Sequence, residues 1–426
     1  MSIFVVLMIV AVILIGYKTN INFGIFAIVA AYIIGSFALG IGPAKLTAMW
    51  PTRIFFLILT ISFFYAFPML NGTLEKIALK VVYAGRNVAW FIPILLFLLS
   101  FVICGIGAGP YASTAIMTPI AMSIASLSGL HPFLAAITVA TGSMAGGTTP
   151  ISIGGIVMKG LIEQLGFAEQ SGVYGIGIMV NIIKVMTIIF LLTYVVLKGY
   201  KIKVPTMEKP EPFNKIQRRN LAVIIFVAAI LILPFLVDLI VPGIPIIKTL
   251  TKNVDVAFVS IIGVMLSLIL KLGDERKAIS KIPLGLLITL CGMGMLIQVA
   301  VEAGTVEMLS AWMSNNVSSS LAPAALVLVS GLLSIISSGL AVVIPTLFPL
   351  VPGISSTLGM SAGVLFSAIA IGMNTTTMSP FSTGGGLILG GIEDETERKK
   401  MIQYMLFFPF IMIAITILLV LLGVVR

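Results

Sequence analysis

Two stretches of this 426-residue chain decide its fold. The first reads GSMAGGTTPISIGG from Gly142 to Gly155, and the second reads GMNTTTMSPFSTGG from Gly372 to Gly385. Each is a polar, glycine-rich run inside an apolar segment, and each contains a proline, Pro150 or Pro380. Proline lacks an amide proton, clashes with a preceding carbonyl and disfavours helical geometry in the residue before it. We therefore expect an apolar helix to be interrupted at each stretch.

The surrounding composition is that of a membrane protein. The chain is 59% hydrophobic and only 9% charged, with a mean hydropathy of +1.19. Runs of roughly 18–25 apolar residues recur along it, each long enough to cross about 30 Å of hydrocarbon as a helix. The first, Ser2–Ile15, has no basic residues before it and no small-residue cleavage site after it, so we interpret it as a retained helix. The sequence predicts an all-α polytopic membrane protein.

The two interruptions also predict where the functional site lies. Unpaired backbone groups cost several kcal/mol each in hydrocarbon, so such breaks are tolerated only inside protein or along a water-filled cavity. Helices that begin after a break present free amides and the positive end of a dipole, which suit a carboxylate or phosphate. Freed carbonyls and hydroxyls suit a hard cation such as sodium.

The chain matches itself without a gap when it is shifted by 230 positions. Glycine-rich membrane helices can match by chance, but Gly72–Glu75 also matches Gly304–Glu307 at a nearly identical shift. The shift aligns eight glycine, proline and serine residues, which are residue types that interrupt helices. The aligned sets are Gly109, Pro119, Gly129, Gly142, Pro150, Ser152, Gly154 and Gly155 in the first half, and Gly339, Pro349, Gly359, Gly372, Pro380, Ser382, Gly384 and Gly385 in the second.

Each half then contains three helices, a short amphipathic helix, two apolar pieces meeting at a polar or glycine-rich tip, a broken helix and a final helix. The predicted domains are residues 1–198, a linker at 199–218, and residues 219–426. Within them we expect a scaffold of about 1–86, 172–316 and 400–426, and a transport core of about 88–165 and 320–392.

The pieces around the first tip, Val88–Cys104 and Pro110–Leu127, are consistent with either two full spans or one re-entrant hairpin. Charge favours the hairpin, because the densest basic loop, residues 198–219, should be cytoplasmic. If each hairpin returns to its own side, each half crosses five times and the second half is inverted. The amphipathic pair agrees, since Leu74–Tyr83 carries two lysines and Val306–Val317 has Glu307 and no basic residue. Inverted repeats with interrupted helices are typical of secondary transporters.

The candidate site residues come from both tips and both breaks. For the substrate we expect Gly107, Ala108, Gly109, Thr148, Thr149, Pro150, Ser338, Gly339, Thr376, Thr377, Ser379 and Pro380. For sodium we expect Gly105, Ser143, Gly146, Ser337, Asn374 and Thr375. For any one of these residues the alternative is structural, because Ser and Thr often only bond the preceding helical turn and Gly often only allows close packing.

Several other functions are disfavoured. Cys104 and Cys291 lie in apolar runs without the spacing of a metal site or a disulfide. The net charge of +10 sits in short loops, which is a topology signal and not a nucleic-acid surface. Neither tip and neither break contains Asp or Glu, which disfavours a carboxylate proton relay. The lone histidine, His131, precedes Pro132 at an expected helix start, so we interpret it as a loop residue and expect no enzyme.

Two longer segments, Ser113–Met122 and Ala140–Pro150, give a family resemblance. With them, the chain resembles the ion transporter superfamily, in particular the divalent anion:sodium symporters and the malonate-type dicarboxylate carriers. The resemblance implies a homodimer whose scaffold holds still while hairpins and broken helices move as an elevator. It also implies one anion site flanked by sodium sites. One departure is clear: the symporters carry Ser-Asn-Thr at each tip, where this chain has Gly105–Gly109 and Ser337–Gly339.

The sequence therefore predicts a secondary transporter of small organic anions, most of all dicarboxylates, in a bacterial or archaeal cytoplasmic membrane. Sodium is the expected coupling ion, and no other cofactor is expected. The alternatives are the membrane subunit of a tripartite carrier, a proton-coupled anion transporter, an exchanger, or a cation/proton antiporter. Substrate length, stoichiometry and the choice between symport and exchange stay open.

Overall fold

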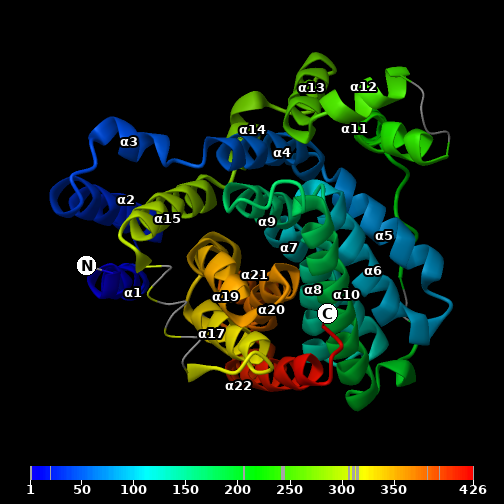
Figure 1. Cartoon of the computed structure of the whole chain (residues 1–426). Coiled ribbons are helices and arrows are strands. Elements are labelled where there is room, and N and C mark those ends of the chain that lie inside the picture. The colour runs from blue at the N-terminus through cyan, green and yellow to red at the C-terminus, as the bar shows by residue number, and fades with distance from the viewer. Residues whose placement is uncertain are drawn as a thin grey trace.

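The computed structural model of the chain is a bundle of helices (Figure 1). It describes residues 2–19, 21–204, 207–240, 245–305, 308, 312, 316–380, 382–392 and 394–425. Within these ranges there is no β-strand, and six helices are long and apolar enough to cross a membrane. The predicted all-α polytopic membrane fold is confirmed.

The first half begins with peripheral helices and ends with a long one. Its helices are α1 (Ser2–Thr19), α2 (Phe23–Tyr32) with a π-helical turn (Ile33–Ala38), α3 (Pro43–Ala48), α4 (Thr52–Leu70), α5 (Thr73–Gly85), α6 (Ile92–Ile103), a π-helical turn (Cys104–Ala108), α7 (Pro110–Ser128), α8 (Pro132–Gly146), α9 (Ile153–Gln164) and α10 (Ser171–Val196). The expected amphipathic helix is α5, and the two apolar pieces are α6 and α7.

The second half follows the same order. Its helices are α11 (Lys215–Ile240), α12 (Pro245–Asn253), α13 (Val256–Ile269), α14 (Glu275–Ser280), α15 (Leu284–Glu302), α17 (Ala322–Ile336), a π-helical turn (Gly339–Val343), α18 (Ile344–Leu347), α19 (Val351–Leu358), α20 (Ala362–Thr375), α21 (Thr383–Gly390) and α22 (Glu395–Leu421). The expected amphipathic helix at Val306–Val317 lies largely outside the described residues.

Equivalent helices of the two halves make equivalent contacts. Helix α6 packs along α8, and α17 packs along α20. Both α8 and α20 also pack against α10. In Figure 1 the hairpins and broken helices gather in the middle of the molecule, while α1–α3 and α11–α13 lie at its periphery. Order and packing therefore repeat, whereas the inverted orientation of the second half stays a prediction.

Both predicted helix interruptions are present, but each starts later than expected. Helix α8 continues to Gly146 and α9 begins at Ile153, while α20 continues to Thr375 and α21 begins at Thr383. A proline disturbs the carbonyl four residues before it and the conformation of the residue just before it. Residues 142–146 and 372–375 can therefore stay helical, and the open backbone among the described residues comprises 147–152, 376–380 and 382.

The first hairpin turns on glycine. Gly107 has φ +118° and Gly109 has φ +84°, conformations that side chains with a Cβ rarely adopt. The Tyr65 hydroxyl of α4 donates to the Ile106 carbonyl and so holds this turn from the side. In the second hairpin, Ser337 and Ser338 instead take extended backbone conformations. The two tips are therefore built differently, as their sequences differ.

Candidate functional site

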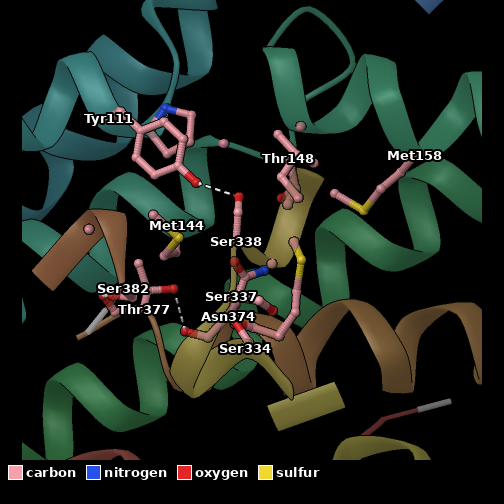
Figure 2. Close-up of a pocket in the computed structure, with 17 residues that line it drawn as sticks. Tyr111, Met144, Thr148, Met158, Ser334, Ser337, Ser338, Asn374, Thr377 and Ser382 are labelled. Carbon is pink, nitrogen blue, oxygen red and sulfur yellow. Dashed lines mark hydrogen bonds between the residues drawn. The ribbon is translucent and has the colours of Figure 1, made fainter. Parts of the chain in front are cut away.

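A small cavity lies where the hairpin tips meet the interrupted helices (Figure 2). Its volume is about 40 Å³. Both halves line it, through α7, α8 and α9 on one side and α17, α20 and α21 on the other. None of its lining residues carries a charge. The polar side chains that line it are Tyr111, Thr148, Ser334, Ser337, Ser338, Asn374, Thr377 and Ser382.

The helices that start after the breaks both begin at this cavity. Gly154 in the first turn of α9 and Gly384 in the first turn of α21 line it. The first amides of a helix have no partner within the helix, and the helix dipole makes this end positive. Two positive helix ends therefore converge on one small space.

Close packing holds these helix starts against the breaks. A Cβ on Gly155 would lie 2.1 Å from the Thr149 carbonyl oxygen, and one on Gly385 would lie 1.9 Å from the Ser379 carbonyl oxygen. The two contacts are equivalent, since the 230-position shift places Gly155 on Gly385 and Thr149 on Ser379. Only glycine allows each chain break to fold back onto the helix that follows it.

Three polar side chains of the second half donate hydrogen bonds to backbone carbonyls. Ser334 Oγ donates to the Met373 carbonyl at 2.9 Å, Ser337 Oγ donates to the Leu333 carbonyl at 2.6 Å, and Asn374 Nδ2 donates to the Ala370 carbonyl at 3.0 Å. A carbonyl oxygen can only accept, so each side chain must be the donor. What the two serines can offer a ligand is oxygen lone pairs, whereas Asn374 keeps its amide oxygen and one further N–H.

Three further lining hydroxyls follow the same rule. Thr148 Oγ1 donates to the Ala145 carbonyl at 2.9 Å, and Thr377 Oγ1 donates to the Asn374 carbonyl at 3.0 Å. Ser382 Oγ caps α21 by accepting from the Gly385 amide at 3.1 Å, and it donates to the Thr377 carbonyl at 2.6 Å. The cavity is therefore rich in acceptors and poor in side-chain donors.

One hydrogen bond joins the two hairpins across the cavity. The Tyr111 hydroxyl in α7 lies 3.2 Å from Ser338 Oγ at the second tip, as Figure 2 shows. Sequence reasoning missed Tyr111, Ser334 and Ser382. Ser382 had a signal, because it belongs to the Pro-x-Ser-x-Gly-Gly pattern shared by both breaks. Tyr111 and Ser334 had none, because they lie inside helices with no unusual spacing.

The structure brings together six of the predicted site residues. Of the predicted substrate residues, Thr148, Ser338, Gly339 and Thr377 line the cavity, and of the predicted sodium residues, Ser337 and Asn374 do. Ala108 and Gly109 line a neighbouring cavity of about 230 Å³ that reaches Lys281. Gly105, Thr149 and Pro150 line a third, mostly apolar cavity of about 660 Å³ beside α10.

In each half, one predicted ligand residue joins the hairpin to the helix break by a hydrogen bond. Thr149 Oγ1 donates to the Gly105 carbonyl at 2.6 Å, and Ser379 Oγ donates to the Ile335 carbonyl at 2.9 Å. The two bonds are related by the 230-position shift. Both side chains thus have structural contacts that account for their presence without a ligand.

The other predicted residues lie away from the cavity lining. Ser143 Oγ donates to Ser113 Oγ at 2.9 Å, and Thr375 Oγ1 donates to the Gly372 carbonyl at 2.6 Å. Among the described residues, the buried Thr376 hydroxyl has no hydrogen-bond partner. Gly107 faces Tyr65, Gly146 faces the Phe101 carbonyl, and Pro380 is half-buried. Roles for these residues in binding stay predictions.

Part of the chain matches a known protein family. Residues 1–147 match the family model described as the N-terminus of the dicarboxylate carrier protein MatC. The chain is similar to dicarboxylate carriers. The resemblance expected from the sequence is thereby confirmed. No curated protein sequence matches the chain significantly.

Two solved structures match the chain over most of its length. The YdaH transporter of Alcanivorax borkumensis has a TM-score of 0.61 at 16% identity, covering 89% of this chain and 86% of its own. MtrF of Neisseria gonorrhoeae, described with a class of antimetabolite efflux pumps, has a TM-score of 0.48 at 13% identity, covering 91% of this chain and 83% of its own. The likeness to YdaH shows a shared fold over most of both chains.

Proposed function

We propose that this protein is a secondary transporter that moves small organic anions, with dicarboxylates as the leading substrate class. The observation that carries the proposal is the convergence of the α9 and α21 helix starts on one uncharged, polar cavity inside the bundle. Helix starts attract carboxylates, and interrupted helices in membrane proteins line substrate paths. The similarity of residues 1–147 to a dicarboxylate carrier supports the same substrate class.

Sodium is the proposed coupling ion. No lysine, arginine or histidine lines the cavity, so the charge of a bound anion meets only helix ends and whatever cation binds beside it. Side-chain oxygens with their protons already engaged suit a hard cation. A carboxylate relay for protons has no candidate among the lining residues.

For the movement we propose the elevator expected from the family resemblance, in a homodimer placed in a cytoplasmic membrane. The two halves would be inverted repeats, with the hairpins and broken helices as the moving core. The packing of α10 on α8 and α20, and of α22 on α17 and α20, favours including these two long helices in that core. Both helices fall largely in the scaffold that the sequence predicts, at 172–316 and 400–426, so the proposed core is larger than that prediction.

A direct test is uptake by purified protein in liposomes. With an inward sodium gradient, we expect labelled malonate or succinate to accumulate above its equilibrium level. Uptake that does not depend on sodium but is abolished by a protonophore would identify the proton as the coupling ion in place of sodium. Accumulation that requires an anion inside the liposomes, and no gradient, would make the protein an exchanger. Failure to move any organic acid would reject the proposal.

A further inference from the structure

Two cavities lie in equivalent places of the internal repeat. Helices α4 and α15 are related by a shift of 232 positions at both ends. Each begins after a proline, Pro51 or Pro283, whose φ is −77° in both and whose ψ is 69° and 66° respectively. Pro283 lines the cavity of about 230 Å³ that reaches Lys281, and Pro51 lines a cavity of about 20 Å³. We call the cavity beside Pro283 the wide vestibule and the cavity beside Pro51 the narrow vestibule.

The two vestibules differ in charge and polarity at equivalent positions. The shift of 232 positions places Lys281, Ser62 and Tyr65 of the wide vestibule on Met49, Gly294 and Ile297 of the narrow one, and all six line their cavities. An ammonium group and two hydroxyls therefore have no polar counterpart. The narrow vestibule does contain Gln164 and Gln298, which carry no charge. Among the described residues, Lys281 is the only charged side chain that lines either vestibule.

The wide vestibule adjoins the candidate site. Pro110, Tyr111 and Leu340 line both this vestibule and the site cavity. Figure 2 shows the Tyr111 ring beside the site cavity, with its hydroxyl directed at Ser338. No described residue lines both the narrow vestibule and the site cavity. In this conformation the path to the site therefore runs from the wide vestibule past Tyr111.

The charge of Lys281 is available to a ligand. The residue lies between α14 and α15 and is exposed. Within the described part of the chain, no carboxylate forms an ion pair with it. A helix start accompanies each vestibule, α15 for the wide one and α4 for the narrow one, so the lysine is what distinguishes their electrostatics. An unpaired cation at a concave opening raises the local concentration of anions.

A second group in the wide vestibule is suited to an anion. Ser62 lines this vestibule, and its buried Oγ has no hydrogen-bond partner among the described residues. A buried hydroxyl without a partner is costly, and a hydroxyl can donate to a carboxylate. The counterpart of Ser62 in the narrow vestibule, Gly294, has no side chain that could do so. The wide vestibule therefore combines a cation with an unpartnered donor.

Charge also indicates the face of the membrane to which the wide vestibule opens. The segment 271–281 contains the basic residues Lys271, Arg276, Lys277 and Lys281, and two acidic residues. Loops rich in lysine and arginine stay in the cytoplasm, as expected for the linker at 199–218. If the two halves are inverted, the narrow vestibule is the equivalent entrance on the opposite face. The volumes of about 230 Å³ and about 20 Å³ then describe a protein that is open to the cytoplasm and closed to the outside.

We propose that the wide vestibule is the cytoplasmic entrance to the transport path and that Lys281 is its selectivity residue, which draws divalent organic anions toward the site. The opposite entrance, with Met49 in the equivalent position, selects without a charge. The inference rests on the proposed anion transport and adds a specificity determinant that acts on one face only. Coulomb attraction grows with the charge of the ligand, so Lys281 favours a dicarboxylate over a monocarboxylate.

The first test measures the charge selectivity of the wide vestibule without any substrate. Ala115→Cys places a thiol in the wall of this vestibule, whereas Cys104 and Cys291 are buried. Everted membrane vesicles present the cytoplasmic face, and in them the thiol is modified with anionic sulfonatoethyl or cationic trimethylammonioethyl methanethiosulfonate. Adding Lys281→Met should lower the anionic-to-cationic ratio of the two rates about three- to tenfold, and adding Lys281→Arg should preserve it.

Lys277→Met is the matched control, because it removes the same charge from α14 and Lys277 does not line the vestibule. The ratio of the two rates should stay nearly unchanged in this control. An equal ratio with and without Lys281, or an equal fall in the control, would overturn the inference. Modification of Ala115→Cys in right-side-out vesicles alone would also overturn it, because the vestibule would then open to the outside.

Uptake separates this inference from the proposed function. For sodium-driven malonate uptake, Lys281→Met should raise KM about threefold or more in everted vesicles and leave it unchanged in right-side-out vesicles. Malonate uptake with an unchanged KM on both faces would reject the inference and keep the function. A lowered reagent ratio in a protein that moves no organic acid would keep the anion-selective vestibule and reject the proposed substrate class.

Discussion

Gly385 and Gly386 are neighbours in α21 with opposite surroundings. A Cβ on Gly385 would overlap the Ser379 carbonyl oxygen at 1.9 Å, while nothing lies within 4 Å of a Cβ on Gly386. We expect Gly385→Ala to force α21 away from its break at a cost of about 1–3 kcal/mol or more, and to abolish transport. Gly386→Ala should leave both properties nearly unchanged. Melting temperatures in detergent and liposome uptake measure the two effects, and equal behaviour of the two variants would contradict this packing.

His131 lies at the start of α8, where its Nδ1 accepts from the Phe133 amide at 3.2 Å. Partial burial lowers the pKa of this imidazole below its usual 6.5. The unfolded chain therefore binds more protons at His131 than the folded chain does, so the stabilisation present above about pH 6.5 is lost as the pH falls. Protonation would also remove the acceptor that caps α8.

The test of this residue is His131→Asn, because asparagine is a good helix cap that does not titrate. We expect the melting temperature of the unmodified protein to fall between about pH 7.5 and about pH 5.5, and the fall to be smaller in the variant. A pH dependence that is the same in both proteins would show that other groups cause it.

At the scale of elements, each hairpin is tied to the break of its own half by one equivalent hydrogen bond. Thr149→Val and Ser379→Ala remove the donors to the Gly105 and Ile335 carbonyls. An orphaned buried carbonyl costs about 1–3 kcal/mol, so we expect lower melting temperatures and slower transport in both variants, without loss of folding. The measurements are thermal unfolding and initial uptake rates.

Thr193→Val is the control for these two variants, because within the described part of the chain the Thr193 hydroxyl bonds only the Ile189 carbonyl of its own helix. Its melting temperature should change little. If Thr149→Val instead raised the KM for the anion and left stability unchanged, Thr149 would be a substrate ligand and not a tie between elements.

At the scale of the whole molecule, the arrangement in the membrane is the decisive open prediction. If each hairpin returns to its own side, the loop between α9 and α10 is external and the linker before α11 is cytoplasmic. Glu169 and Glu208 are exposed in these two segments. In intact cells, a membrane-impermeant thiol reagent should label Glu169→Cys, and it should label Glu208→Cys only after permeabilisation. Labelling of both from the same side would show that α10 does not cross the membrane.

The native cysteines do not interfere with this labelling, because Cys104 and Cys291 are both buried. The unmodified protein is nevertheless the control for background reaction.

The sequence alone was sufficient for the helical membrane fold, the order of elements in each half and the two helix interruptions. These features depend on local chemistry: apolar length for a membrane helix, and proline geometry for a break. The position of each break was less certain, since a proline such as Pro150 allows the helix to continue to Gly146. The internal match also identified positions that make equivalent contacts in the structure, such as Gly155 and Gly385.

Only the tertiary structure decided which polar side chains face one another. Thr149 and Ser379 read as ligands in the sequence, but their hydroxyls are engaged by carbonyls of the hairpins. Tyr111 and Ser334 carried no signal, yet both line the cavity. The sequence gives the hydrogen-bond donors and acceptors of each segment. Packing between distant segments determines which of these groups are already paired and which are left for a ligand.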